Sequence, residues 1–298
     1  MVAVGGHEIT LVNLAKPMYP GGFRKAQVID YYTKVAPAML PHLRGRPVTR
    51  VRWPHGTADK SFFEKNKPAG TPEWVHTAKV THKDEVVEYI VADDVATLVW
   101  LANMAALELH PQLHLAARPE RPTVMVFDLD PGAPAALLEC CAVGLEVRDL
   151  LGELGLACWP KVSGGKGMQV YAPLHTPCTY DQTKAFSRGV ARALERADPA
   201  RVTSNMAKAL RTNRVLVDWS QNDEVKTTVA AYSLRGRERP TASAPVAWEE
   251  VEAAVEARDA SGLVFEADQV LERVASKGDL FAEVAKRKQK LPDLGAKG

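Results

Sequence analysis

The stretch Val124-Met-Val-Phe-Asp-Leu-Asp130, followed by Pro131-Gly132, decides the fold because it joins an apolar run to two closely spaced acids. The apolar run predicts a buried strand, and the Pro-Gly pair predicts its end. Side chains alternate along a strand, so Asp128 and Asp130 project from the same face of a sheet. Two carboxylates at such short range repel each other unless a cation lies near, and divalent ions prefer carboxylate oxygens. The stretch therefore predicts a metal site.

A structural interpretation of the two acids stays open, since Asp128 and Asp130 would also serve to end the strand and cap the next helix. An isolated motif of this kind favours that interpretation. The residues in front of the pair favour the metal site instead, because the strand is apolar apart from Thr123 and delivers both acids from a buried position.

Segments on both sides of this strand predict a larger lobe of helices and strands. An Ala- and Leu-rich run up to Leu154, ended by Gly155, predicts a long helix. A strong helix-cap residue, Thr179, predicts the start of another helix, which reaches Ala197. Further strands are predicted at Leu156–Val162, Met168–Leu174 and Arg214–Ser220, and the polar remainder after Pro240 is predicted to be helical.

The first third of the chain predicts a smaller lobe built on an antiparallel sheet. Apolar residues at helical spacing, from Val28 to Met39, predict a packing helix, and a second helix is predicted from Asp93 to about Glu108. Three alternating segments predict strands, at Val48–Trp53, Ser61–Asn66 and Val86–Val91. We expect an α+β fold forming a single domain, 1–298, with an N-terminal lobe over 1–115 and a catalytic lobe with a helical C-terminal tail over 116–298.

The stretch Ser163-Gly-Gly-Lys166-Gly lies between two predicted strands and is a candidate phosphate-binding loop. Its glycines allow backbone amides to turn towards a ligand, while the Ser163 hydroxyl and the Lys166 ammonium add donors. The spacing differs from that of P-loop NTPases and no clear helix follows, which excludes that class. Taken alone, the stretch is better explained as a plain β-hairpin turn.

A second apolar strand also ends in an acid, in Val215-Leu-Val-Asp218-Trp-Ser-Gln221-Asn222. Asp218 would either complete the metal site or be a surface acid at a strand end. His110 and Arg235 are polar candidates for the same pocket. Each has a plainer interpretation, because a single His is more often a packing residue and basic runs are usually solvated.

The composition is that of an ordinary globular protein, with 298 residues, 46% apolar residues and a net charge of +2. No run of 18 apolar residues and no export signal is visible, so we expect a cytoplasmic protein with no membrane partner. The four cysteines show neither CxxC nor zinc-finger spacing. The small net charge hides a basic segment between Arg44 and Lys67, where seven Lys or Arg occur with only Asp59 and Glu64.

Five motifs occur together along the chain: Phe62-Phe63-Glu-Lys-Asn, Ala-Ala-Leu-Glu-Leu-His110, Asp128-Leu-Asp130-Pro-Gly, Ser163-Gly-Gly-Lys-Gly and Asp218-Trp-Ser-Gln-Asn. In this order they resemble the polymerase domain of bacterial ligase D, a branch of the archaeo-eukaryotic primase superfamily. The resemblance covers nearly the whole chain, from Leu14-Ala-Lys16-Pro-Met-Tyr-Pro to the segment of Arg235. The joint occurrence is far more specific than any single motif.

The resemblance implies a primase-polymerase core of mostly antiparallel sheets flanked by helices. It implies a template-dependent polymerase and primase that acts on gapped or broken DNA, prefers ribonucleotides and uses two Mn²⁺ or Mg²⁺ ions. Positions matching the family's metal ligands are Asp128, Asp130 and Asp218. Positions matching its nucleotide-binding residues are His110, Ser163, Lys166, Gln169, Gln221 and Arg235. Lys16 and Lys25 match residues that receive a 5′-phosphate, and Phe62 and Phe63 match a pair that stacks on template bases.

The partners implied by the resemblance are NTP or dNTP and DNA with gaps or broken ends and a 5′-phosphate. Because the chain has no room for the ligase or nuclease modules that often accompany this domain, we expect a stand-alone form associated with the nucleoid. It would need a separate DNA ligase and a DNA end-binding protein. A second departure is Gln169, where the family commonly has His; glutamine donates a hydrogen bond without charge, so nucleotide affinity is expected to be weaker.

The expected reaction is attack of a primer 3′-hydroxyl on the α-phosphate of a nucleotide. Two other classes stay open: an end-binding module that no longer turns over, and a two-metal phosphohydrolase. The intact set of Asp128, Asp130 and Asp218 argues against the first, and the Phe62-Phe63 pair has no purpose in the second. For that pair, the plainer interpretation is one ring in the core and the other incidental, since neighbours on a strand face opposite ways.

Overall fold

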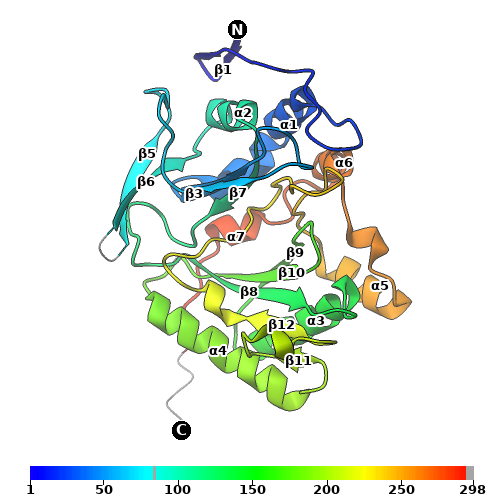
Figure 1. Ribbon diagram of the computed structural model, residues 1–298. Helices are drawn as coiled ribbons and strands as arrows, with labels where there is room; N and C mark the ends of the chain where they lie inside the picture. The colour runs from blue at the N-terminus through cyan, green and yellow to red at the C-terminus, as the bar shows by residue number, and fades with distance from the viewer. Residues whose placement is uncertain (83–84, 293–298) are drawn as a thin grey trace. The chain divides into compact units, whose positions relative to one another are not determined.

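The computed structural model describes residues 1–82 and 85–292, and the chain divides into two compact units (Figure 1). The first unit comprises residues 1–119, 227–244 and 265–279, and the second comprises 120–226, 245–264 and the residues from 280 onward. The first break therefore lies close to the boundary expected near residue 115. The two later segments of the first unit come from the stretch that was expected to belong to the catalytic lobe.

The first unit is built on a five-stranded antiparallel sheet with packed helices. Its elements are β1 (Val2–Val4), β2 (His7–Ile9), α1 (Lys25–Leu43), β3 (Pro47–Arg52), β4 (Phe62–Glu64), β5 (Thr77–His82), β6 (Glu85–Val91), α2 (Val95–Asn103), β7 (Ala106–Pro111) and α6 (Ala267–Lys277). The sheet has the order β4-β3-β6-β5, and β7 also pairs with β3. The predicted strands and packing helix are thereby confirmed as β3, β4, β6 and α1, whereas β5 was not predicted.

The helix predicted from Asp93 to about Glu108 is wrong in its second half. Asp94 caps α2 by accepting a hydrogen bond from the Thr97 amide at 2.7 Å, and the helix ends at Asn103. Ala105 then adopts a left-handed backbone conformation, with φ of 60°, and β7 begins. A continuous apolar run does not distinguish a buried helix from a buried strand, which explains the error.

The second unit is built on a sheet with the order β11-β12-β8-β10-β9. Its elements are β8 (Val124–Pro131), α3 (Leu137–Glu153), β9 (Trp159–Val162), β10 (Met168–Pro173), α4 (Tyr180–Ala197), β11 (Val202–Thr203), η1 (Lys208–Leu210), β12 (Val215–Asp218), η2 (Trp219–Gln221), α5 (Trp248–Ala257), η3 (Ser261–Leu263) and α7 (Ala282–Lys286). All its strand pairs are antiparallel except β11 with β12. The α+β class is confirmed, as is the Thr179 cap of α4, while helix resumes after Pro240 only at Trp248.

Helix α3 covers one face of this sheet and thereby decides where chemistry is possible. It packs against β8 and β10 so closely that a Cβ on Gly144 would lie 2.8 Å from the Met168 sulfur. Met168 and Leu129 are partners in the β8–β10 ladder and both are fully buried beneath the helix. Because alternate residues face opposite ways, the neighbours Asp128 and Asp130 project from the other face.

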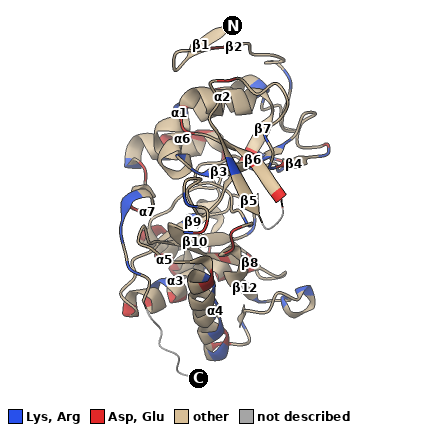
Figure 2. Cartoon of the chain, turned by 90° about the vertical axis from the view of Figure 1, so that its left-hand side faces the viewer, with Lys and Arg blue, Asp and Glu red and all other residues tan. Residues whose placement is uncertain are grey.

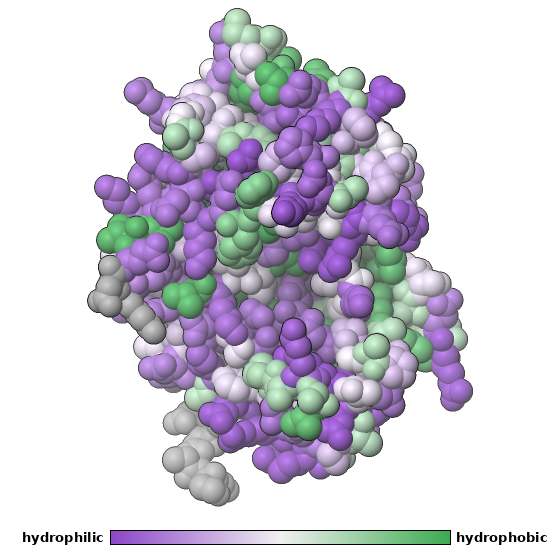
Figure 3. Space-filling view, viewed as in Figure 1, coloured by the Kyte–Doolittle hydropathy of each residue, from purple (hydrophilic) through white to green (hydrophobic). Residues whose placement is uncertain are grey.

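Polar surface dominates the molecule outside these cores. On the face shown in Figure 3, hydrophilic residues predominate and apolar residues form small separate groups. Lys and Arg lie on elements of both units in Figure 2, in keeping with the small net charge. Within the described ranges, no helix combines the length and the apolar composition that a membrane crossing requires.

Candidate active site

Three aspartates meet on one face of the second unit's sheet. Asp128 on β8 and Asp218 on β12 are direct partners in the antiparallel ladder, and Asp130 follows two residues after Asp128. Directly opposed residues and residues two apart share a face. The predicted grouping of the three acids on one face is thus present, and Asp218, only 8% exposed, is no surface acid.

Burial and mutual repulsion raise the pKa values of two members of this group. Burial, followed by the charges of Asp130 and Asp218, raises the pKa of Asp128 to about 7. Burial and the charge of Asp218 also raise the pKa of Asp130, against a lowering contribution from Arg211. A divalent cation would offset this repulsion.

The Asp218 carboxylate is held by its own strand end. The Ser220 amide and hydroxyl donate to Asp218 Oδ1 at 2.9 and 2.6 Å, and Gln221 Nε2 donates to Oδ2 at 2.9 Å. Gln221, predicted to bind nucleotide, therefore lies at the acid group and orients one of its members.

The acid group suits a divalent ion that is completed by other ligands. Over the described residues, no group of three or more His, Cys, Asp or Glu side chains has the arrangement of a metal centre. Mg²⁺ is usually bound through one or two carboxylates together with water and substrate phosphates, so a protein cage is not required. The carboxylates of the buried Asp218 and of the half-buried Asp128 and Asp130 fit such an ion.

Gln169 lies beside the acids, but its polar atoms are already engaged. It is 3% exposed, donates from Nε2 to Asp128 Oδ1 at 3.0 Å and accepts at Oε1 from Lys161 Nζ at 2.5 Å. Lys161 is fully buried, and sequence reasoning missed it because a single lysine in a short strand carries no sign of burial.

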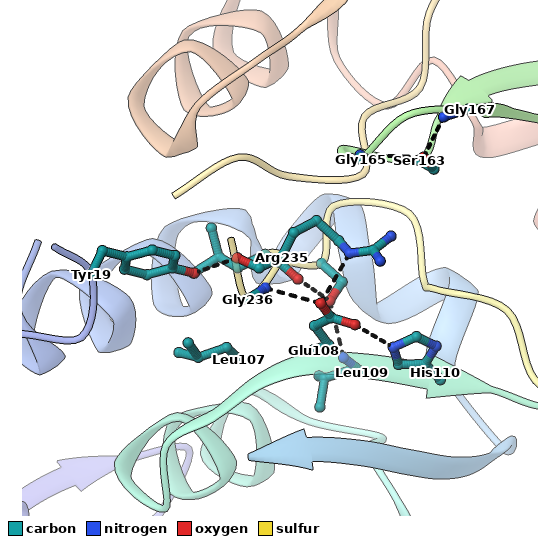
Figure 4. A network of polar contacts seen from close by, with 12 residues as sticks. Tyr19, Leu107, Glu108, Leu109, His110, Ser163, Gly165, Gly167, Arg235 and Gly236 are labelled. Carbon is teal, nitrogen blue, oxygen red and sulfur yellow. Dashed lines mark hydrogen bonds and ion pairs between the residues drawn. The ribbon is translucent and has the colours of Figure 1, made fainter. Parts of the chain in front are cut away.

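The stretch from Ser163 to Gly167 is the turn between the antiparallel strands β9 and β10. The Ser163 hydroxyl accepts hydrogen bonds from the amides of Gly165 and Gly167 at 3.2 and 3.3 Å (Figure 4). A Cβ on Gly167 would lie 2.1 Å from the Leu129 carbonyl oxygen, so glycine is required there. The stretch therefore has the geometry of a β-hairpin turn. Lys166, the positively charged residue of this turn, is exposed.

In the first unit, Glu108 brings together two predicted nucleotide-binding residues. Its carboxylate accepts from His110 Nε2 at 2.8 Å, from Arg235 Nε at 3.1 Å and from the Gly236 amide at 2.9 Å (Figure 4). Burial raises the pKa of Glu108, but the His110 hydrogen bond and the Arg235 charge outweigh it and lower the pKa to about 2. Glu108 was missed because this segment was expected to be helical; on a strand, the pattern Glu-x-His places both side chains on one face.

Lys16 and Lys25 lie across a short turn from each other. The Lys25 amide donates to the Lys16 carbonyl at 2.9 Å, and their ammonium groups donate to the carbonyls of Val12 (Lys25, 3.2 Å) and Pro54 (Lys16, 2.5 Å). Burial, then the positive charges of Lys16 and Arg52, lowers the pKa of Lys25. The two lysines therefore lie next to each other in the first unit, and the charge of Lys16 acts on Lys25.

Both rings of the Phe62-Phe63 pair are exposed. Phe62 is 52% and Phe63 59% accessible, although they are neighbours on β4. The plainer interpretation, with one ring in the core and the other incidental, is wrong, because β4 is a three-residue strand at the edge of its sheet and both rings stay exposed.

Comparison with known proteins agrees with this geometry. Residues 24–281 match the family model described as "LigD, primase-polymerase domain". The chain is 42% identical over 290 residues to the multifunctional non-homologous end joining DNA repair protein LigD of Mycobacterium tuberculosis, and 34% identical over 269 residues to the bifunctional LigD of Bacillus subtilis. These alignments cover 94% and 90% of this chain but only 37% and 42% of the two relatives.

Among solved structures, the polymerase domain of Mycobacterium tuberculosis ligase D in complex with DNA is similar, with a TM-score of 0.88 and 39% identity. The match covers 95% of this chain and 99% of that domain. A family match over most of the chain, relatives above 30% identity and a shared fold all point the same way. The chain belongs to the LigD primase-polymerase domain family.

Proposed function

We propose that the chain is a template-dependent nucleotidyltransferase, a DNA and RNA polymerase with primase activity, that fills gaps or extends broken ends in DNA repair. The observation that carries this proposal is the group of three aspartates on the face of the second unit's sheet opposite to α3. Family membership supports it, since relatives are named as non-homologous end joining proteins and the solved polymerase domain is described in complex with DNA.

The acids and their neighbours divide the chemical work. Asp128, Asp130 and Asp218 would hold Mn²⁺ or Mg²⁺, which supplies a charge that activates the primer hydroxyl and neutralises the leaving phosphates. Gln221 and Ser220 fix the Asp218 carboxylate before any ligand arrives. Positioning and charge neutralisation account for most catalysis of phosphoryl and nucleotidyl transfer.

Each unit, considered by itself, carries donors suited to a nucleotide. In the second unit, the turn after β9 offers the Lys166 ammonium and the Ser163 hydroxyl, which suits a triphosphate. In the first unit, Arg235 and His110 are the candidate donors, and the Glu108 carboxylate orients both. Ribonucleotides are the proposed substrates on the strength of the family resemblance.

Binding of DNA would rest on stacking and on phosphate contacts. The exposed Phe62 and Phe63 rings offer stacking surface for template bases, and such contacts do not depend on base identity. Phosphate contacts from Lys16, Lys25 and the basic first unit make binding sensitive to salt. An extended strand leaves a nick, so a DNA ligase activity must follow, and a DNA end-binding protein would bring broken ends together.

The test is incubation of a labelled gapped duplex with ribonucleotides or deoxyribonucleotides and with Mn²⁺ or Mg²⁺. We expect extension of the primer that requires a template base and a divalent ion. Release of mononucleotides without extension would identify a phosphohydrolase instead. A mobility shift with neither reaction would identify an end-binding module and refute the proposed activity.

A further inference from the structure

Four polar side chains form a row across four of the five strands of the second unit's sheet. In the ladders, Lys161 on β9 pairs with Gln169 on β10, Gln169 pairs with Asp128 on β8, and Asp128 pairs with Asp218 on β12. Direct cross-strand partners project from the same face, so the row has a lysine at one end and the acids at the other. Three of the four residues lie on the interior strands β12, β8 and β10, and Lys161 lies on β9, which is next to β10.

The hydrogen bonds in this row have a fixed direction. A lysine ammonium only donates, so the Gln169 side-chain oxygen must face Lys161 and its NH₂ group must face the carboxylate. The observed contacts agree: Lys161 Nζ donates to Gln169 Oε1 at 2.5 Å, and Gln169 Nε2 donates to Asp128 Oδ1 at 3.0 Å. Lys161 therefore selects the orientation in which the amide holds Asp128.

For folding alone, a buried ammonium at this position is a poor choice. Lys161 is fully buried, and transfer of a charge from water into a protein interior is costly. An apolar side chain of similar length would fill the same space without that cost. The ring of Tyr171, whose centroid lies 5.5 Å from Lys161 Nζ, is one of the groups that offset this cost.

We propose that Lys161 is a positioning residue for the acid group: through Gln169 it fixes the Asp128 carboxylate. This inference rests on the proposed polymerase function. Gln169 is in this view a connector between Lys161 and Asp128.

The first test replaces the lysine by an uncharged side chain of similar length. Lys161→Met is expected to fold and to unfold at a temperature somewhat below that of the wild type, because the buried Gln169 side-chain oxygen loses its donor. We expect kcat for extension of a gapped duplex to fall about tenfold or more, with the nucleotide KM unchanged within about threefold. The matched control Lys184→Met, which removes an ion pair with Asp223, is expected to keep the wild-type kcat.

A second variant keeps the lysine paired and breaks only the contact to the acid. Gln169→Glu offers Lys161 a carboxylate but removes the N–H donor facing Asp128, so we expect a similar fall in kcat. Combining it with Lys161→Met is expected to cost little more than either change alone, since both act through one contact. If the fold-losses in kcat of the two single variants multiply in the double variant, the two residues act independently. This result would overturn the proposal that Gln169 connects Lys161 to Asp128.

A third readout needs neither metal nor substrate. In the free protein, the Gln169 side-chain NH₂ is expected to exchange slowly with solvent by NMR, and to exchange faster in Lys161→Met. If Lys161→Met lowers stability but leaves both kcat and this exchange unchanged, the lysine is merely structural. A wild-type protein that fails to extend any primer would instead refute the proposed function, whereas the exchange measurement would still test the link to Gln169.

Discussion

Asp128→Asn is expected to abolish primer extension and at the same time to stabilise the metal-free protein. The loss should be on the order of a thousandfold, because the carboxylate acts on charge that develops only in the reaction. The gain in stability follows because the substitution removes one of three negative charges that lie close together. Many active sites combine function with local destabilisation in this way.

The sign of the pH dependence follows from the raised pKa of Asp128. In the folded protein this carboxyl keeps its proton up to about pH 7, whereas in the unfolded chain it loses the proton near pH 4. The folded state thus binds more protons between these values, and the stability of the metal-free wild type should fall as pH rises from about 4 to about 7. At pH 8 we expect Asp128→Asn to be more stable by about 1–3 kcal/mol, or roughly 2–4 °C in Tm per kcal/mol.

The measurement is thermal unfolding across pH 5 to 8, with and without Mn²⁺, beside the extension assay. The metal ion should raise the Tm of the wild type, since it binds the folded state alone, and should raise that of Asp128→Asn much less. Asp149→Asn, which changes an exposed acid on α3, serves as the control and should alter neither activity nor metal response. A large stability loss in Asp128→Asn would mean that the carboxylate is structural.

Removal of the 5′-phosphate from the downstream strand of a gap is expected to weaken binding by the wild type roughly tenfold or more. Two charge-assisted contacts of about 1.5–3 kcal/mol each account for such an effect. The structure strengthens the expectation, because Lys25 is buried beside the positive charges of Lys16 and Arg52. A dianion would relieve the repulsion that lowers the pKa of Lys25.

The double change Lys16→Ala with Lys25→Ala should erase the discrimination between phosphorylated and unphosphorylated gaps. Its matched control is Lys60→Ala with Lys79→Ala, which removes two exposed lysines of the same unit and should weaken both substrates equally. Titrations of both duplexes at several salt concentrations provide the comparison. Equal affinity of the wild-type protein for the two duplexes would rule out a specific phosphate pocket.

Local sequence signals predicted the parts of the fold that depend on local interactions. The apolar run before Asp128 gave the central strand, and Thr179 gave the start of α4 because a cap depends on a few neighbouring residues. The segment of Glu108 was assigned wrongly, since its apolar run fits a helix or a strand and only pairing with β3 decides. Because this strand was predicted as a helix, Glu108 was not recognised as the partner of His110 and Arg235.

The acidic residues of the candidate site could be predicted from the sequence, whereas the residues that position these acids could not. Asp128 and Asp130 share a face through the simple alternation of a strand, whereas Lys161 reaches them only through the register of three strands. Register between distant segments depends on the packed sheet and leaves no mark in a single sequence. The exposed Phe62 shows the converse case, where a short edge strand does not bury the face that alternation predicts.

The course of the chain between the two units has a consequence for biosynthesis. The chain passes from one unit to the other five times, and the first unit receives its last segment, with α6, only at residues 265–279. A ribosome therefore releases the sheet of the first unit long before the segment that carries Arg235 and the helix that packs on α1. Neither unit is complete until nearly the whole chain has been translated, so the N-terminal half should need protection from aggregation during synthesis.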